Sequence, residues 1–198
     1  MSDRLFPDDV LFSQRILSCC HLYTGPLNGS WDAVTDAADQ EFYRRCDQIA
    51  GDVAKFDSRS ERNIRTLIIE VQPLCRESLR KIRAAGLDAR VISGTRTYAE
   101  QTALYRQGRY GNAGNIVTNA KAGQSWHNFG RAWDIGIFKN GAYLADGPEY
   151  AQAATHGKIS KVEWGGDWTT FKDKPHYQVI GQFGTLTAVR NDFERGGR

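Results

Sequence analysis

SWHNFGRAWDIGIF, residues 125–138, joins a histidine-bearing turn to what has the composition of a buried strand. Its second half, AWDIGIF, is a short apolar run of the kind that is typical of a strand inside a core. His127 and Asp134 bracket Gly130 and Ala132, which carry little or no side chain, so the backbone can bend between them. The imidazole and the carboxylate can therefore converge, and such a pair is a typical part of a metal site.

A second histidine in a similar setting extends this hypothesis. The chain has only four histidines. His176 lies in KDKPHYQ, where Pro175 stiffens the approach to a second strand signal. Two histidines and a carboxylate are a common zinc set in hydrolases, and they leave one position for water. Asp173 lies three residues before His176, so it could reach that water without binding the metal. Of the other two histidines, we expect His156 at the surface and His21 in helix packing.

The N-terminal part of the chain is predicted to be a small helical unit. Apolar residues from Val10 to Cys20 recur at roughly helical spacing, and the turn-rich segment YTGPLNGSWD follows. A second helix is predicted from about Ala33 to Ile49. The polar run KFDSRSER (55–62) is typical of a linker. We therefore place a small all-α module at residues 1–54 and a second domain at residues 55–198.

The second domain is predicted to be α+β. Apolar spacing from Ile64 onward predicts a long amphipathic helix that ends at Gly86, with Pro73 kinking it or starting its second half. Thr97 and Glu100 form a capping box for a helix that stops at Gly108. Short strands are expected at residues 88–94, 132–138, 163–164 and 176–180. Helices first and short strands later favour a small antiparallel sheet with packed helices, which carries the zinc site.

The composition is that of a soluble globular protein, and it excludes several functional classes. The chain has 198 residues, of which 40% are hydrophobic and 25% charged, and its net charge is +3. There is no dense basic block, so nucleic acid is not an expected partner. Nor is there an apolar run long enough for membrane insertion or a signal-peptide pattern, so we expect synthesis in the cytoplasm and release by another route. The cysteines, which match no zinc-ribbon spacing, are expected to be buried and reduced: Cys19, Cys20, Cys46 and Cys75.

Taken together, the motifs of the second domain resemble one family. Four segments carry the resemblance and occur in the expected order over roughly residues 60–180. They are Ser93-Gly94-x-Arg96 with the following EQTALYRQGR, Ser125-x-His127-x-x-Gly130-x-Ala132-x-Asp134, Trp164-Gly165-Gly166-Asp167-Trp168, and Asp173-x-Pro175-His176. The chain resembles the zinc peptidases that include D-alanyl-D-alanine carboxypeptidases and L-alanyl-D-glutamate endopeptidases, which share a fold with the hedgehog signalling domain. The combination of the four segments is far more specific than any single motif.

The resemblance implies a role for each residue. His127, Asp134 and His176 would bind zinc, and Asp173 would be the general base and then the general acid. Arg96 would face the scissile amide and stabilise the oxyanion. Ser125 and Gln101 are candidates for substrate binding, although packing explains Gln101 and the neighbouring Tyr105 equally well.

Other residues near these motifs leave alternatives open. Glu163 and Asp167 are rival carboxylates, and either could orient a ligand histidine. Trp164 and Trp168 are expected in the core or in the wall of a cleft. Residues 1–54 resemble the peptidoglycan-binding-like module of cell-wall hydrolases through Gly25, Asn28, Gly29, Thr35, Ala38 and Phe42. A helical cap that only packs on the second domain is the alternative.

The expected function is that of a monomeric, endolysin-like zinc peptidase of bacterial peptidoglycan. By resemblance to phage endolysins, the favoured bond is L-alanyl-D-glutamate in the stem peptide. A D-alanyl-D-alanine carboxypeptidase is the alternative within the class. A non-catalytic wall-binding protein on the same fold is the alternative from another class, and the presence of both Asp173 and Arg96 argues against it.

Overall fold

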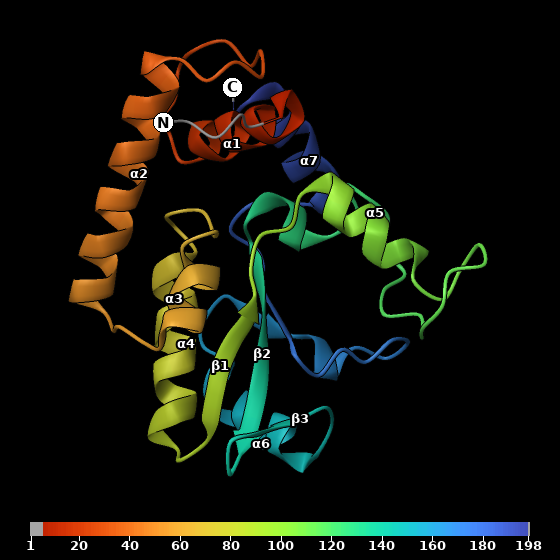
Figure 1. The fold of residues 1–198 in the computed structure, drawn as a ribbon. Helices are drawn as coiled ribbons and strands as arrows, with labels where there is room; N and C mark the ends of the chain where they lie inside the picture. Colours follow the sequence, from red (N-terminus) through yellow and green to blue (C-terminus); the bar gives the residue numbers. More distant parts are fainter. Residues whose placement is uncertain (1–5, 198) are drawn as a thin grey trace.

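A five-stranded antiparallel sheet forms the centre of the molecule. The computed structural model describes residues 6–197. The strands follow the order β1 (Asp88–Ser93), β2 (Ala132–Lys139), β5 (His176–Val179) and β4 (Val162–Trp164), and β3 (Ala142–Leu144) also pairs with β2. Every pairing is antiparallel. Helices pack around this sheet (Figure 1), so the predicted α+β class and four of the five strands are confirmed.

The register of the central strands brings the predicted site residues together. Asp134 on β2 is the partner of His176 on β5, and on its other side it is the partner of Ser93 on β1. The register between β1 and β2 shifts at Ile92, between Val91 and Ser93. Such an irregularity re-aims the chain at the end of a strand. Here it lies at the point where β1 leads into the segment that carries Arg96.

The N-terminal helices follow the prediction closely. Helix α1 spans Pro7–Cys19, and α2 spans Ala33–Asp52, with the Asp32 side chain accepting a hydrogen bond from the backbone of Thr35. His21 does not pack between helices as expected. It is exposed in the turn after α1, where its φ of 56° ends the helical path.

The segment that the sequence predicted to be a linker contains a helix. Helix α3 spans Ser58–Ile64, and the Asp57 side chain caps its first turn. The linker prediction is wrong here because the side chain of Glu61 is buried against Arg76 of α4, although its polar sequence neighbours are typical of an exposed segment. Polarity along the sequence does not reveal that a charged side chain has a buried partner.

The predicted long helix of residues 64–85 is interrupted. Residues 65–71 form turns, and α4 spans Gln72–Ala84 with Pro73 in its first turn, so Pro73 starts a helix rather than kinking one. Leu67, Ile68 and Val71 are buried in the core without being helical. The backbone N–H of Ile68 donates to the carbonyl of Gly130 at 3.2 Å.

The remaining helices complete the layers around the sheet. Helix α5 (Tyr98–Arg106) has the predicted capping box of Thr97 and Glu100. Helices α6 (Pro148–Gly157) and α7 (Leu186–Arg195) and strand β3 were not predicted. Helix α6 packs on α4, and α7 packs on α1. No helix among residues 6–197 is both long and apolar enough to cross a membrane.

The N-terminal helices share their core with the rest of the chain. Buried side chains of α1 and α2, such as Leu17 and Phe42, belong to the same apolar cluster as Leu79 and Trp133. The Ser18 hydroxyl also hydrogen-bonds the carbonyl of Gly196, near the other end of the chain. The predicted boundary between residues 54 and 55 stays a prediction. All four cysteines are buried and free, as expected.

Candidate metal centre

Three predicted site residues converge at one end of the sheet. His127 lies on a 3-10 turn, η1 (Trp126–Phe129), Asp134 on β2 and His176 at the start of β5. His127 Nε2 is 3.1 Å from Asp134 Oδ1 and 3.1 Å from His176 Nδ1, and the third side of this triangle is 3.2 Å. These three side chains are the group that could hold a metal ion among the described residues.

The opposite atom of each side chain is held by the protein. His127 Nδ1 lies 2.6 Å from the carbonyl oxygen of Gly94, so it must donate its proton there. His176 Nε2 lies 3.0 Å from Gln178 Oε1, and Arg96 Nη2 donates to Asp134 Oδ2 at 2.7 Å. The network therefore assigns unprotonated nitrogens and one free carboxylate oxygen to the centre of the triangle.

This donor set fits a small divalent cation. Ligand atoms about 2.0–2.1 Å from a tetrahedral ion lie roughly 3.3 Å apart, close to the three separations in this cluster. Two imidazole nitrogens that face each other without a proton between them repel, and a bound cation removes that repulsion. The cluster therefore has the composition, spacing and buried setting of a metal site that leaves room for a further ligand.

The electrostatics of the cluster depend on burial and on Asp134. Burial lowers the pKa of His127, which favours the neutral form that binds metals. Burial also raises the pKa of Asp134, but the histidines and Arg96 outweigh it and hold that pKa well below its usual value. For His176, burial lowers the pKa, whereas the hydrogen bond to Asp134 raises it, and the net shift is upward.

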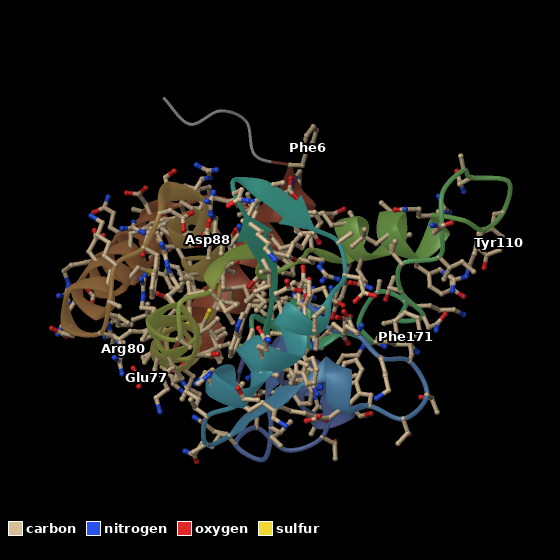
Figure 2. The ribbon with its side chains drawn as sticks, turned by 90° about the horizontal axis from the view of Figure 1, so that it is seen from below. Phe6, Glu77, Arg80, Asp88, Tyr110 and Phe171 are labelled. Atoms are coloured by element: carbon tan, nitrogen blue, oxygen red, sulfur yellow. The ribbon has the colours of Figure 1, made fainter. Side chains whose placement is uncertain are left out.

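The cluster lies in a cleft of about 630 Å³. The predicted residues Arg96, Ser125 and Asp173 line this cleft. Its walls include Trp126, Trp168, Phe171 and the segment 117–120. Figure 2 shows Phe171 on one loop and Tyr110 at the tip of another, on the same side of the molecule. The cleft is thus a mixed apolar and polar groove with the three candidate ligands in its lining.

Asp173 is placed beside the cluster by a tight turn. Its backbone N–H donates to Gly165 O at 3.0 Å, and its own carbonyl accepts from the backbone of His176 at 3.2 Å. A Cβ atom at Gly165 would lie 2.5 Å from the Asp173 carbonyl oxygen, so this approach requires glycine. Burial, and then the charge of Asp134, raises the pKa of Asp173. Its carboxylate accepts no hydrogen bond from any described residue, which leaves it free to act on a water or a substrate.

Comparisons with known proteins agree with this arrangement. A family model described as D-alanyl-D-alanine carboxypeptidase, of the M15 peptidases, matches residues 118–179. The chain is 34% identical over 125 residues to the peptidoglycan L-alanyl-D-glutamate endopeptidase CwlK of Bacillus subtilis (strain 168), a match that spans 56% of this chain and 74% of that protein. The chain belongs to the M15 peptidase family. Members of this family are metallopeptidases.

Two further proteins resemble this M15 peptidase. It is 29% identical over 127 residues to the L-alanyl-D-glutamate peptidase of Listeria phage A118. This match covers 61% of this chain but only 41% of the phage protein. The crystal structure of the Serratia marcescens L-Ala D-Glu endopeptidase ChiX matches 63% of this chain and 89% of that chain, with 29% identity and a TM-score of 0.49.

Arg96 of this M15 peptidase has more partners than the sequence predicted. Besides Asp134, it donates to Ser93 Oγ at 3.3 Å and to Gln101 Oε1 at 3.1 Å. Gln101, expected at the substrate, is fully buried and donates in turn to the carbonyl of Ala120. In this structure Gln101 therefore orients Arg96, and its role in substrate binding stays a prediction, as does that of Ser125.

Sequence reasoning missed one residue that contacts the cluster. Gln178 hydrogen-bonds His176, and Glu163 accepts from Gln178 at 2.9 Å, so Glu163 reaches the cluster indirectly. Residues two apart on a strand share a face, and this periodicity could have pointed from His176 to Gln178. Asp167, the other rival carboxylate, pairs with Lys158 at the surface.

The remaining candidates lie where they were expected. Trp164 is buried in the core, and Trp168 lines the cleft. His156 is exposed.

Proposed function

We propose that this M15 peptidase is a zinc-dependent endopeptidase that hydrolyses the L-alanyl-D-glutamate bond of peptidoglycan stem peptides. The observation that carries the proposal is the buried His127–Asp134–His176 triangle with the unpaired Asp173 carboxylate beside it. The activities of the Bacillus and phage relatives support the choice of bond. Two nitrogens and one oxygen favour zinc over the hard cations calcium and magnesium.

The chemistry of the reaction assigns distinct tasks to the protein groups. Zinc, when bound, would act as a Lewis acid and lower the pKa of water. Asp173 accepts a proton from the water that attacks the scissile carbonyl carbon. It then donates that proton to the leaving amine as the carbon–nitrogen bond breaks. Its raised pKa suits this double role, because a carboxylate with a pKa closer to neutrality gives the proton back more easily.

Arg96 is proposed to combine two tasks. Its guanidinium holds Asp134 Oδ2, and its side chain is 17% exposed in the lining of the cleft. The permanent charge of this group stabilises the oxyanion that develops on the carbonyl, while its fixed geometry maintains the orientation of Asp134. Lysine would supply the charge without the simultaneous contacts to Ser93, Gln101 and Asp134.

The direct test is mass spectrometry of purified peptidoglycan after digestion with the zinc-loaded protein. We expect new N-terminal D-glutamate residues and L-alanine left at the end of the glycan-linked peptide. Protein dialysed against a chelator is the control and should release nothing. Loss of terminal D-alanine alone would contradict the proposed bond and support the carboxypeptidase alternative, which the family description favours. No new termini, with zinc bound, would support the non-catalytic alternative.

We further propose that residues 1–54 hold the enzyme on peptidoglycan. A second cavity, of about 360 Å³, lies between the N-terminal helices and the catalytic part. Its lining combines aromatic and charged side chains, among them Phe12, Tyr43, Asp39 and Arg62. Aromatic faces beside polar groups suit a ligand with both apolar and polar sides, such as the sugar rings of a glycan strand.

Tyr43→Ala should weaken this attachment several-fold. The Tyr43 side chain lines the cavity and is 47% exposed, so its removal takes away contact area with little cost to folding. Cosedimentation of zinc-loaded Asp173→Asn protein with insoluble peptidoglycan measures binding without digestion. Tyr143→Ala is the matched control, because that tyrosine is 48% exposed but lies on β3, away from the cavity. Equal binding by both variants would support the helical-cap alternative.

A further inference from the structure

A chain of hydrogen bonds leads from the candidate metal ligand His176 to the cleft wall. His176 Nε2 contacts Gln178 Oε1 at 3.0 Å, and Gln178 Nε2 donates to Glu163 Oε2 at 2.9 Å. The other oxygen of Glu163 accepts from Trp168 Nε1 at 2.7 Å. The Trp168 ring returns to the start of the chain, because its centroid is 5.1 Å from that of His176. The side chains of His176, Gln178, Glu163 and Trp168 thus form a closed ring of contacts beside the metal site, which we call the circuit.

The sheet register builds this circuit. Glu163 on β4 is the direct partner of Gln178 on β5, and Gln178 lies two residues after His176 on the same face of the strand. Gln178 is only 8% exposed, so water has little access to compete for its amide. The hydrogen bonds of Gln178 are therefore set by the two protein groups on either side of it.

The direction of each hydrogen bond in the circuit follows from the chemistry of Glu163. An ionised carboxylate only accepts hydrogen bonds, whereas an amide both donates and accepts. Glu163 therefore requires the NH2 group of Gln178, which turns the amide oxygen of Gln178 toward His176. That oxygen can only accept a hydrogen bond, so His176 Nε2 carries the proton and the lone pair of His176 is on Nδ1, the atom that faces His127 and Asp134.

We propose that Glu163 is a positioning residue that fixes the metal-binding tautomer of His176 through Gln178. The inference rests on the proposed metal site and adds a residue to it that touches neither metal nor substrate. Trp168 strengthens the arrangement, because its indole N–H can only donate and so keeps the second oxygen of Glu163 as an acceptor. The same contact holds the Trp168 ring in the wall of the cleft.

Glu163→Gln is the decisive single change, because it replaces one oxygen by NH2 at constant shape. Trp168 still requires an oxygen from residue 163, so the new NH2 group points at Gln178. Gln178 must then turn its oxygen toward residue 163 and its NH2 toward His176. This favours the tautomer with the lone pair on Nε2, which cannot bind metal at Nδ1. We expect zinc affinity, measured by competition with a chromogenic chelator, to fall by about 10- to 100-fold.

A swap of the two side chains, Glu163→Gln combined with Gln178→Glu, should restore zinc affinity. The new amide at position 163 donates to the new carboxylate at position 178, and that carboxylate also accepts from His176. The hydrogen bonds that His176 and Trp168 donate keep their directions, and only the one between positions 163 and 178 is reversed, with the same set of atoms. Nitrogen-15 NMR of His176 in the metal-free proteins gives a second readout, with the proton on Nε2 in the wild type and in the swap but not in Glu163→Gln. A role in packing alone predicts no such rescue.

Asp167→Asn is the matched control, since this nearby carboxylate pairs only with Lys158 at the surface. It should bind zinc as the wild type does. Wild-type affinity and an Nε2 proton in Glu163→Gln would overturn the inference while leaving the proposed function intact. If Glu163→Gln binds zinc weakly and the swap does not restore zinc affinity, the positioning role through Gln178 is also overturned. A wild-type protein that binds no zinc would instead contradict the proposed function itself.

Discussion

Asp173→Asn should leave the protein folded and able to bind zinc but slow peptide cleavage by about 10²- to 10⁴-fold, the usual contribution of a general acid–base group. Asparagine has nearly the same shape, and the turn that places residue 173 is held by backbone hydrogen bonds to Gly165 and His176. The amide cannot accept a proton from water or return it to the leaving amine. Only the proton transfer is lost, because the candidate ligands His127, Asp134 and His176 are unchanged.

The measurement is the single-turnover rate of cleavage of a purified stem-peptide fragment, with zinc content determined on the same samples. Asp167→Asn removes a nearby carboxylate that has no contact with the cluster, and it should cleave at the wild-type rate. Undiminished cleavage by Asp173→Asn would show that another group moves the proton. Loss of zinc together with activity would show instead that Asp173 maintains the site.

Glu61→Gln should destabilise the fold by about 3–5 kcal/mol, the range found when one partner of a buried ion pair is removed. Arg76 is fully buried, and its two terminal nitrogens donate to the two carboxylate oxygens of Glu61 at 2.7 and 2.9 Å. The same carboxylate accepts from the backbone of Phe56. A glutamine at this position leaves the Arg76 charge in the core with only neutral partners, among them the carbonyl of Ala54.

Thermal unfolding measures this effect. For a chain of this size, the loss corresponds to a fall in Tm of about 6–20 °C. Glu77→Gln is the matched control, because the Arg80–Glu77 pair has the same 2.7 Å distance at the surface (Figure 2). We expect Glu77→Gln to lower the free energy of unfolding by less than about 1 kcal/mol. Equal effects of the two substitutions would show that burial of the Glu61–Arg76 pair does not determine its contribution.

The effect of Glu61→Gln should also depend on pH in a defined direction. Burial raises the pKa of Glu61, but the hydrogen bonds from Arg76 and Phe56 outweigh it, so the pKa in the folded state is below the ordinary value. The ionised pair therefore stabilises the fold fully above the unfolded-state pKa of about 4.3. This contribution is lost as the pH falls through the folded-state value. The difference in the free energy of unfolding between the wild type and Glu61→Gln should therefore become smaller below about pH 4.

Local signals in the sequence were enough for the features that depend on near neighbours. The capping box of Thr97 and Glu100 involves residues three apart, and the strand at β2 follows from a short apolar run. His127, Asp134 and His176 could be selected as candidate ligands because their residue types and flanking Gly130, Ala132 and Pro175 are visible in the sequence itself. The four buried cysteines likewise follow from composition and spacing.

Features that depend on a distant partner were decided only by the tertiary structure. Glu61 looks like part of a polar linker until Arg76, fifteen residues later, is placed beside it. Gln178 and Glu163 act on His176 only because β4 and β5 pair in a particular register. Burial and hydrogen-bond direction are properties of the packed chain: the sequence names the groups that can bind a metal, and the packing determines which atom of each group faces it.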